Sequence, residues 1–556
     1  MLIELDGRTL LRVERARLRQ LCTHLVDLLD APPGPGGVRV APGQAMALEG
    51  FEGFGPRWLG GDRLRALADR LRSLATPPVV AAPPGLQAEL RPYQLIGLAW
   101  LQRLRELGLG GVLADDMGLG KTVQTIAHLL VELHAGRLDR PALVVCPASV
   151  VGTWANELAR FAPGLRALVL HGGDRERDPA VLAGQHVLIT TYATLLRDRA
   201  ALARVPLHLV VCDEAQMIKN AGAKAGDAVR ELDTRHRLCL TGTPVENHLG
   251  ELFTLVHWLA PGLLGSRARF DRVFRKAIEG GRDPARQELL RRRLAPVLLR
   301  RTKEAVAPEL PPRTESVVSV RFGDAQRALY ESVRLAMDDR LRGLLAGKGL
   351  ARSHIEVLDA LLKLRQVCCD PRLVKTPAAK RVTDSAKLEA LRDLLGSLIE
   401  DGRRVLLFSQ FTAMLDLIES DVVRPAGIPF LRLDGTTRER QPLVERFQAG
   451  EAPLFLISLK AGGTGLTLTA ADAVILYDPW WNPAAERQAA DRAHRIGQDK
   501  PVFVYRLVAA GTVEERIQRL QERKRAIAAG VHDEDGQSGP VLGEDELRAL
   551  FAPLEE

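Results

Sequence analysis

The sequence predicts an α/β fold with two parallel-sheet lobes, and two observations carry this prediction. From residue 86 to about 260, short β-branched and apolar runs alternate with helical segments, and the alternation returns after about residue 380. Buried parallel strands appear as such continuous apolar runs, with helices between them that cover both faces of the sheet. The stretch between the two regions is charged and helical. The strand candidates are Leu143–Pro147, His186–Thr191, Leu209–Glu214, Arg237–Thr243, Arg404–Gln410, Pro453–Leu459, Ala473–Pro479 and Val502–Val508.

Two proline- and glycine-rich stretches, Ala31–Gly37 and Thr76–Gly85, set a small N-terminal region apart from the lobes. Leucine and arginine recur at helical spacing in residues 1 to about 30, which predicts a helix there. A length of 556 residues allows three or four compact units. The predicted organisation is an N-terminal accessory region (1–85), a first lobe (86–262), helical protrusions with the lobe linker (263–380), a second lobe (381–530) and an acidic tail (531–556).

The composition is that of a globular protein with a modest basic excess. The chain has 77 Lys and Arg against 69 Asp and Glu, a net charge of +8, and 46% of its residues are hydrophobic. This balance allows an anionic partner without requiring one. The N-terminus carries charges throughout, unlike a signal peptide, and no run of about 18 apolar residues could cross a bilayer. We therefore expect a cytoplasmic, nucleoid-associated protein with no membrane partner.

The six cysteines include no C-x-x-C pair and no Cys/His cluster at zinc spacing, so no zinc site is expected. Cys146 and Cys212 lie within apolar runs and are interpreted as buried thiols in a reducing compartment.

A glycine-containing turn between a short apolar run and an amphipathic helix ends in Gly118-Leu119-Gly120-Lys121-Thr122. Phosphate binding requires closely approaching backbone N–H groups, a helix N-terminus, a lysine for the β and γ oxygens and a hydroxyl for Mg²⁺, and this turn supplies all four. The usual first glycine of such a loop is Asp115 here. A tight turn with an incidental lysine is the alternative interpretation.

Asp213 and Glu214 end an apolar run that predicts a buried strand 92 residues after Lys121. Ligands bind at the carboxyl ends of parallel strands, so Asp213 can reach Mg²⁺ and Glu214 can polarise an attacking water. An exposed acidic loop is the alternative, but it does not explain why the pair ends a strand.

Six motifs occur in order along the chain: DDMGLGKT, DEAQMIKN, LTGTPVENHLGEL, LLRRTKEAV, DPWWNP and RAHRIGQ. With Leu90–Gln94, they resemble the Swi/Snf-type double-stranded DNA translocases, a branch of the superfamily-two helicase-like ATPases. The resemblance extends from about Leu86 to about Arg525. It implies two RecA-like lobes with inserted helical protrusions, ATP and Mg²⁺ as cofactors, and double-stranded DNA as partner.

The resemblance implies a role for each residue of the nucleotide site. Gln94 would bind the adenine edge, Lys121 the β and γ phosphates, and Glu214 would be the catalytic base or water-positioning group. Thr122 and Asp213 would hold Mg²⁺. Thr241 and Thr243 would couple the site to DNA, although their segment could also be a simple turn. The remaining loop residues in the predicted ATP contact are Asp116, Gly118, Leu119 and Gly120.

By the same resemblance, the second lobe would complete the ATP site through Arg492 and Arg495, whose i, i+3 spacing predicts that they share one helical face. An arginine from another unit can neutralise charge in the transition state. Gln498 would contact the nucleotide as well. The alternative is a solvated basic helix face.

The resemblance also suggests nucleic-acid contacts on both lobes. Arg300, Arg301 and Lys303 would touch DNA or belong to a salt-bridged protrusion surface. A core role remains open for one of the two adjacent tryptophans, Trp480 and Trp481. The candidate contacts are Ser149, Trp154, Thr191, Lys460, Thr464 and Trp481.

The predicted function is an ATP-dependent motor that moves along duplex DNA and remodels or displaces bound protein. The alternatives are a strand-separating helicase and a factor that binds RNA polymerase and recycles it. The residues leave the cargo open.

Overall fold

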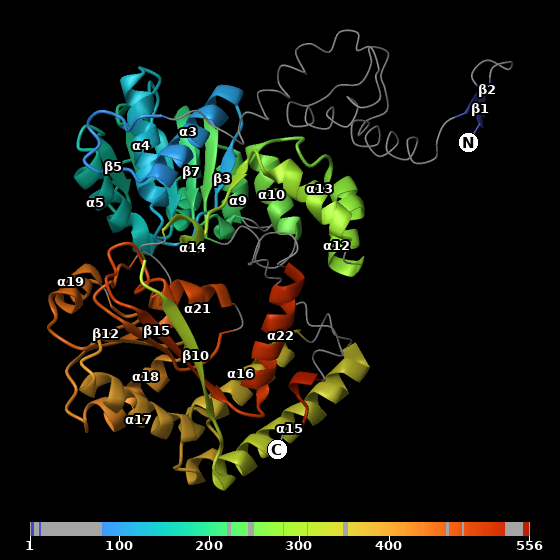
Figure 1. The fold of residues 1–556 in the computed structure, drawn as a ribbon, viewed down its shortest axis with the longest axis vertical. Helices are drawn as coiled ribbons and strands as arrows, with labels where there is room; N and C mark the ends of the chain where they lie inside the picture. Colours follow the sequence, from blue (N-terminus) through green and yellow to red (C-terminus); the bar gives the residue numbers. More distant parts are fainter. Residues whose placement is uncertain are drawn as a thin grey trace. The chain divides into compact units, whose positions relative to one another are not determined.

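The computed structural model describes residues 2–4, 10–12 and 80–554, apart from 219–223, 243–248, 282, 308–309, 349–353, 438, 463–465, 481–482 and 529–548. The chain divides into two compact units, the first built mainly from residues up to Thr302 and the second mainly from Lys303 to Ala528 (Figure 1). Each unit holds one parallel sheet, so the predicted α/β class with two parallel-sheet lobes is confirmed.

All strand pairs in the first unit's sheet are parallel, and the strand order is β5-β6-β4-β7-β8-β3-β9. Every residue of β4 is buried, as expected for a strand covered on both faces. The strands are β3 (Gly111–Leu113), β4 (Ala142–Cys146), β5 (Ala167–Leu170), β6 (Val187–Thr191), β7 (Leu207–Asp213), β8 (Thr234–Leu240) and β9 (Leu298–Leu299).

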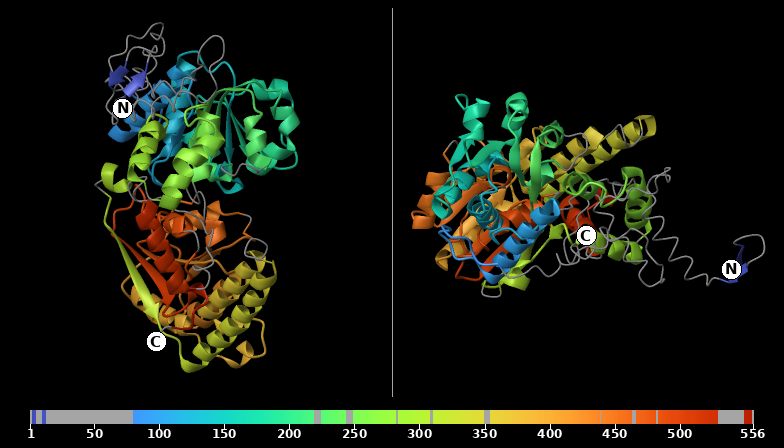
Figure 2. Two further views of the ribbon diagram at one scale, coloured as in Figure 1. Left: turned by 90° about the vertical axis from the view of Figure 1, so that its right-hand side faces the viewer. Right: turned by 90° about the horizontal axis from the view of Figure 1, so that it is seen from above.

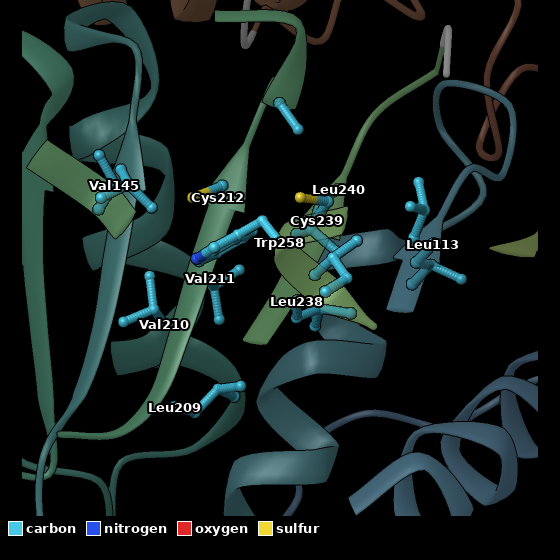
Figure 3. Packing of buried hydrophobic residues seen from close by; sticks show 14 of the residues in the cluster. Leu113, Val145, Leu209, Val210, Val211, Cys212, Leu238, Cys239, Leu240 and Trp258 are labelled. Carbon is cyan, nitrogen blue, oxygen red and sulfur yellow. The ribbon is translucent and has the colours of Figure 1, made fainter. Parts of the chain in front are cut away.

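Helices follow the strands of this sheet, and their apolar sides bury its faces. Figure 3 shows Trp258 of α10 among the side chains of β7 and β8. The helices are α3 (Pro92–Leu107), α4 (Lys121–His134), α5 (Val151–Phe161), α6 (Pro179–Ala183), α7 (Tyr192–Arg197), α8 (Arg199–Leu202), α9 (Lys224–Arg230), α10 (Leu249–Leu259), α11 (Arg267–Phe270), α12 (Lys276–Gly281) and α13 (Pro284–Leu294), with two 3₁₀ turns, η2 (Ala148–Val150) and η3 (Ala215–Met217), and a π-helical segment, η4 (Asp271–Arg275).

The second unit's sheet is also entirely parallel, in the order β10-β15-β14-β11-β13-β12. The long strand β10 forms its edge (Figures 1 and 2). The strands are β10 (Arg313–Val320), β11 (Val405–Ser409), β12 (Phe430–Leu433), β13 (Leu454–Ser458), β14 (Ala473–Leu476) and β15 (Val502–Ala509).

Two long helices of the second unit, α15 (Asp324–Lys348) and α16 (His354–Cys369), lie side by side (Figures 1 and 2). They share a core with α22 that includes Tyr330, Leu361 and Ile517. The other helices are α14 (Lys303–Val306), α17 (Ala386–Glu400), α18 (Thr412–Ile418), α19 (Gln441–Ala449), α20 (Leu459–Gly462), α21 (Pro483–Ala490) and α22 (Val513–Ala528), with turns η6 (Pro371–Leu373), η7 (Ala379–Arg381) and η8 (Glu419–Val423).

The segment predicted as a separate helical middle, residues 263–380, is divided between the two units at Thr302 and Lys303. Strand β9 pairs with β3 in the first sheet, and β10 pairs with β15 in the second. Backbone pairing therefore assigns each half of this segment to the sheet that it extends. Within this segment, β10 forms an edge strand of the second sheet.

The N-terminal helix prediction is wrong where the structure describes that region. Leu2–Glu4 (β1) and Leu10–Arg12 (β2) form an antiparallel pair. An Asp-Gly pair, a hairpin turn signal, stands between them in the sequence at residues 6 and 7. The rest of residues 1–79 and most of the acidic tail lie outside the described residues.

Cys146 and Cys212 are fully buried, which confirms the expectation of buried thiols. Burial raises the pKa of both thiols, so they remain protonated at neutral pH. Within the described ranges, no helix is long and apolar enough to cross a membrane.

A polar cluster around Glu132 lies inside the first unit and links α4 to β7 and β8. The fully buried Glu132 carboxylate lies 3.2 Å from His208 Nε2 and accepts a hydrogen bond from Arg137 Nη2 (2.7 Å). The His208 ring packs edge-on against His236, with ring centroids 5.1 Å apart. His128, one turn before Glu132, is buried as well, with Nδ1 2.9 Å from Gln102 Nε2.

Burial lowers the pKa of His128 to about 4, from an ordinary value near 6.5. Between pH 6.5 and pH 4, His128 is therefore protonated in the unfolded chain and neutral in the folded chain. The free energy of unfolding falls as the pH decreases through this range. This group alone should reduce the free energy of unfolding by about 2 kcal/mol between pH 7 and pH 5.

We therefore expect His128→Gln to lose less stability than the wild type between pH 7 and pH 5 in urea unfolding. His171→Gln changes an exposed histidine of the same unit and serves as the control. An equal loss in all three proteins would contradict the assignment of this titration to His128.

Candidate active site

Three neighbouring strands of the first sheet bring the predicted nucleotide residues to one edge. In the parallel register, Leu240 of β8 lies opposite both Leu113 of β3 and Asp213 of β7. The loop after β3 leads to Lys121, β7 ends in the Asp-Glu pair, and β8 is followed by Thr241. The carboxyl edge of a parallel sheet is where ligands bind, so this edge is the candidate active site.

The loop after β3 has the backbone geometry of a phosphate cradle. Gly118 and Gly120 adopt φ values of 90° and 77°, a region that favours glycine, and α4 begins at Lys121. A Cβ on Gly120 would lie only 2.5 Å from Gln94 Nε2, so a larger residue there would displace the Gln94 amide. The loop thus places backbone amides and a helix N-terminus together, as anion binding requires.

Lys121 lies inside this loop. Its ammonium donates to the carbonyl oxygens of Asp115 (2.5 Å) and Asp116 (3.2 Å). Burial lowers the pKa of Lys121, while Asp115, Glu214 and Asp213 oppose that shift through their charges. The electrostatic coupling shows that the structure brings the predicted phosphate lysine and the predicted Asp-Glu pair together.

Asp213 is held at the end of β7 by an indole. Trp154 of α5 donates from Nε1 to Asp213 Oδ2 at 2.8 Å. Burial and the neighbouring Glu214 charge raise the pKa of Asp213, and the Trp154 hydrogen bond lowers it. The Trp154 side chain is 1% exposed and is engaged inside the first unit, while the predicted nucleic-acid contact of this residue stays a prediction. Its amphipathic ring supports the predicted metal ligand.

Glu214 adopts φ 49°, and no other non-glycine residue in the described part of the chain has a positive φ. Such backbone is strained for a residue with a side chain and is typical of functional sites. Gln216 Nε2 donates to Glu214 Oε2 (2.7 Å), and Thr241 Oγ1 donates to Gln216 Oε1 (3.1 Å). A chain of hydrogen bonds therefore joins the end of β8 to the predicted catalytic carboxylate.

Gln94 lies in the first turn of α3, which begins with a proline at its first position. Its Oε1 accepts from the Arg91 amide (2.9 Å), and its Nε2 lies 3.3 Å from the Tyr93 hydroxyl. The side-chain amide is thus ordered next to the phosphate loop. Its predicted contact with adenine stays a prediction.

The residues at this edge fit ATP and Mg²⁺. The glycines leave room for phosphate oxygens, and the helix N-terminus and Lys121 supply positive charge. No group of three or more His, Cys, Asp or Glu that could hold a metal occurs in the residues that the structure describes. Mg²⁺ at nucleotide sites takes one or two protein oxygens and the phosphates, so Thr122 and Asp213 suffice.

The arginines predicted to complete the site lie in the second unit, and their local structure differs from the expectation. Helix α21 ends at Ala490, so Arg492 and Arg495 stand in the turns that follow it rather than on one helical face. Arg492 Nη1 donates to the Leu466 carbonyl (3.2 Å), and Arg495 Nη1 donates to Thr467 Oγ1 (2.9 Å). Their action on ATP stays a prediction.

The structure does not support nucleotide binding by Gln498. Its Nε2 donates to carbonyl oxygens of Thr469, Ala471 and Ala493, and its Oε1 accepts from the amides of the next two residues. The amide is buried and fully engaged within the second unit. Its role is to hold this turn region against the neighbouring loop.

The structure describes only some of the other residues that were predicted to contact nucleic acid. Thr191 is 4% exposed, and its hydroxyl caps α7 by accepting from the Thr194 amide (3.0 Å), while its predicted nucleic-acid contact stays a prediction. Ser149 lies in η2, and its predicted contact stays a prediction. Lys460 lies in α20 without a described side chain, while Thr464, Trp481 and the coupling residue Thr243 lie outside the described residues.

The sequence did not predict two residues of the cluster that supports the phosphate loop, and it assigned a third residue to another role. Asp115, interpreted as a departure from the glycine pattern, is fully buried and paired with Arg301, which was assigned to DNA or to a protrusion surface. Gln124 of α4 bridges both. An aspartate in an otherwise apolar strand end was the available signal, because a buried carboxylate requires a cationic partner.

A phosphate loop after β3 and an Asp-Glu pair two strands away, on an all-parallel sheet, define a P-loop nucleotide hydrolase. Comparison with known families is more specific. Residues 93–373 match the SNF2-related domain, and residues 386–497 match the helicase conserved C-terminal domain. The chain therefore belongs to the SNF2-related family of helicase-like ATPases, whose members are ATP-hydrolysing enzymes.

Relatives occur in bacteria, eukaryotes and archaea. YwqA of Bacillus subtilis, named as an ATP-dependent helicase/translocase, is 39% identical over 475 residues, 84% of this chain and 51% of that protein. The human SWI/SNF-related matrix-associated actin-dependent regulator of chromatin subfamily A member 1 is 38% identical over 483 residues, covering 83% and 45%. This chain thus spans about half the length of the curated relatives it matches.

Among solved structures, the SWI2/SNF2 ATPase core of Sulfolobus solfataricus in complex with double-stranded DNA is 34% identical. The alignment covers 82% of this chain and 96% of that core, with a TM-score of 0.42.

The role of Trp154 can be tested through the pH dependence of nucleotide binding. Trp154→Phe removes the hydrogen bond that lowers the pKa of Asp213, so more of the carboxyl is protonated near neutral pH. A hydrogen bond to a charged group contributes about 1.5–3 kcal/mol, so Mg²⁺-dependent binding of a fluorescent ATP analogue should weaken roughly tenfold at pH 6.5. At pH 8 the effect should be much smaller.

Trp100→Phe is the matched control, because Trp100 donates a similar hydrogen bond to the Pro296 carbonyl (3.0 Å) in the same unit. Equal weakening by both variants at both pH values would contradict a specific link to Asp213.

Proposed function

We propose that this protein is an ATP-dependent motor that moves along duplex DNA and remodels or displaces proteins bound to it. The observation that carries the proposal is the convergence of Lys121, Asp213 and Glu214 at one edge of the first sheet. Membership in the SNF2-related family supports the coupling of this site to DNA. The proposed location is the nucleoid-associated part of the cytoplasm, where such a motor finds its substrate.

In this proposal, each side chain of the nucleotide site has a role in ATP hydrolysis. The loop amides, the α4 N-terminus and Lys121 bind the phosphates, and Thr122 and Asp213 hold Mg²⁺. When bound, Mg²⁺ neutralises charge on the phosphate oxygens. Glu214 orients the attacking water and accepts its proton. Gln216 and Thr241 hold the Glu214 carboxylate in position, because they join it to the end of β8.

Hydrolysis in this proposal depends on the second unit. Arg492 and Arg495 supply positive charge to the transition state, so that hydrolysis and the movement of one unit against the other are linked. The net charge of +8 agrees with an anionic track. Backbone amides and hydroxyls near the strand ends are suited to phosphate contacts that position a duplex without reading its sequence.

The first experiment is steady-state ATP hydrolysis by the full chain with no nucleic acid, single-stranded DNA, duplex DNA or RNA, at one fixed salt concentration. We expect strong stimulation by duplex DNA. Glu214→Gln is the blank: it should bind ATP while turnover falls by roughly 10²–10⁴-fold, the usual contribution of a general base. Glu231→Gln changes an exposed glutamate of the same unit and should hydrolyse ATP normally.

Other outcomes separate the alternatives. Stimulation by single strands with strand separation would favour a helicase. A flat rate in all four conditions would contradict the duplex motor and favour a factor that acts through a protein such as RNA polymerase. Turnover by Glu214→Gln at the wild-type rate would remove the role assigned to Glu214.

Arg495→Ala should abolish most of the stimulation by duplex DNA, because an arginine that acts in trans on phosphoryl transfer contributes roughly 10³-fold or more to the rate. Nucleotide binding, measured separately, should change little. Arg424→Ala removes an exposed arginine from the same unit and is the control. Undiminished stimulation in Arg495→Ala would exclude this residue as the arginine that acts in trans.

A further inference from the structure

Arg301 stands one residue before the point where the chain passes from the first unit to the second, and its side chain contacts the segments that carry the nucleotide-site residues. The Arg301 side chain is 11% exposed, and its guanidinium binds the fully buried Asp115 carboxylate in a bidentate pair: Nε lies 2.9 Å from Oδ1, and Nη2 contacts Oδ2. The Arg301 carbonyl accepts from the Asp116 amide (3.0 Å). Both backbone and side chain of Arg301 therefore hold the start of the phosphate loop.

The same guanidinium binds the segment that precedes Gln94. Nη1 donates to the Tyr93 carbonyl, and the cation lies over the Tyr93 ring, with Cζ 5.1 Å from the ring centroid. A planar guanidinium can make these contacts and the carboxylate pair at the same time, whereas an ammonium is a single point charge. Arg301 thus contacts the first turn of α3 and the start of the phosphate loop at the same time.

Gln124 closes the cluster. Its Oε1 accepts from Arg301 Nη2 (2.8 Å), and its Nε2 donates to Asp115 Oδ2 (3.3 Å) and to the Gly120 carbonyl (3.2 Å). The α3 helix permits this packing because residue 97 is glycine. A Cβ there would lie 1.9 Å from Gln124 Oε1 and 2.9 Å from Arg301 Nη2.

These contacts replace the two earlier interpretations of Arg301, because its charge is committed to a buried carboxylate of the first unit. They also connect the two ends of the predicted nucleotide site. The contacts of Arg301 with Tyr93 hold the residue next to Gln94. Its contacts with Asp115 and Gln124 hold the loop around Gly120. The Gln94 amide itself lies so close to Gly120 that a Cβ there would be 2.5 Å from it.

We propose that Arg301 is a positioning residue for base recognition, which holds Tyr93 and Gln94 against the phosphate loop so that the site selects adenine over guanine. This proposal rests on the proposed nucleotide-binding function. The Gln94 amide can pair with an adenine edge only in a fixed orientation, since a rotated amide exchanges its donor and acceptor. Arg301 supplies that orientation through the Tyr93 backbone and ring without touching the nucleotide.

The test measures the affinities of the full-length chain for ADP and GDP that carry the same fluorophore on the ribose, with Mg²⁺, and the melting temperature of each variant. Arg301→Gln should reduce the preference for ADP over GDP about tenfold, mainly through weaker ADP binding, because a misaligned hydrogen-bonding site loses discrimination. Arg301→Lys keeps the positive charge next to Asp115 but loses the planar guanidinium that bonds Asp115 and the Tyr93 carbonyl together. This variant should therefore fold and still lose part of the preference for ADP over GDP. If Arg301→Gln fails to fold, Arg301→Lys decides the question.

Two comparisons make the readout specific. Gln94→Ala should lose the same preference, and adding Arg301→Gln to it should cause no further loss, because both changes remove one interaction. Arg292→Ala deletes an exposed arginine of α13 that pairs with Glu288, and it should keep the wild-type preference.

A structural role alone would weaken ADP and GDP equally, whatever the change in melting temperature, and that result would overturn the proposal. A wild-type chain that prefers ADP, with the preference intact in both Arg301 variants, would overturn this inference while leaving the proposed function standing. A wild-type chain that binds neither nucleotide would overturn both.

Discussion

Parallel pairing of β3, β8 and β7 is the constraint on which the rest of the site depends. Parallel strands all point the same way, so the residues that follow them must meet at one edge. Leu240 in the middle strand faces Leu113 on one side and Asp213 on the other. The phosphate loop and the Asp-Glu pair, far apart in sequence, therefore become neighbours through backbone hydrogen bonds alone.

Pairing of buried charged groups then fixes the positions of side chains near this edge. The apolar sheet offers a poor environment for isolated charges, so each buried ionic group is paired or hydrogen-bonded. Asp115 is matched by Arg301, Glu132 by Arg137 with His208 nearby, and Asp213 by the Trp154 indole. The second unit uses the same solution, since Lys387 Nζ lies 2.5 Å from Glu514 Oε2 with both side chains fully buried.

The sequence predicted the central strands well and the edges poorly. All eight strand candidates overlap strands of the structure, because central strands are apolar on both faces and stand out as continuous runs. Strands β5 and β12 were not predicted, because each is only four residues long and so short a run does not separate a strand from a piece of helix. The two-residue β9 depends on pairing with β3 rather than on its own composition. In the N-terminal region, the two described strands form an antiparallel pair where the sequence predicted a helix.

The sequence by itself determined the class of fold and the chemistry of the loop, because glycine, lysine and the Asp-Glu pair carry their functions in local backbone geometry and side-chain type. Only the tertiary structure decided which polar groups are partners. The side chains of Trp154 and Thr191 are buried, the Gln498 amide donates to three carbonyl oxygens, and Arg301 pairs with Asp115 across 186 residues of sequence. Partnership depends on distance in space, and no local pattern encodes which distant strand or helix end will lie opposite a given side chain.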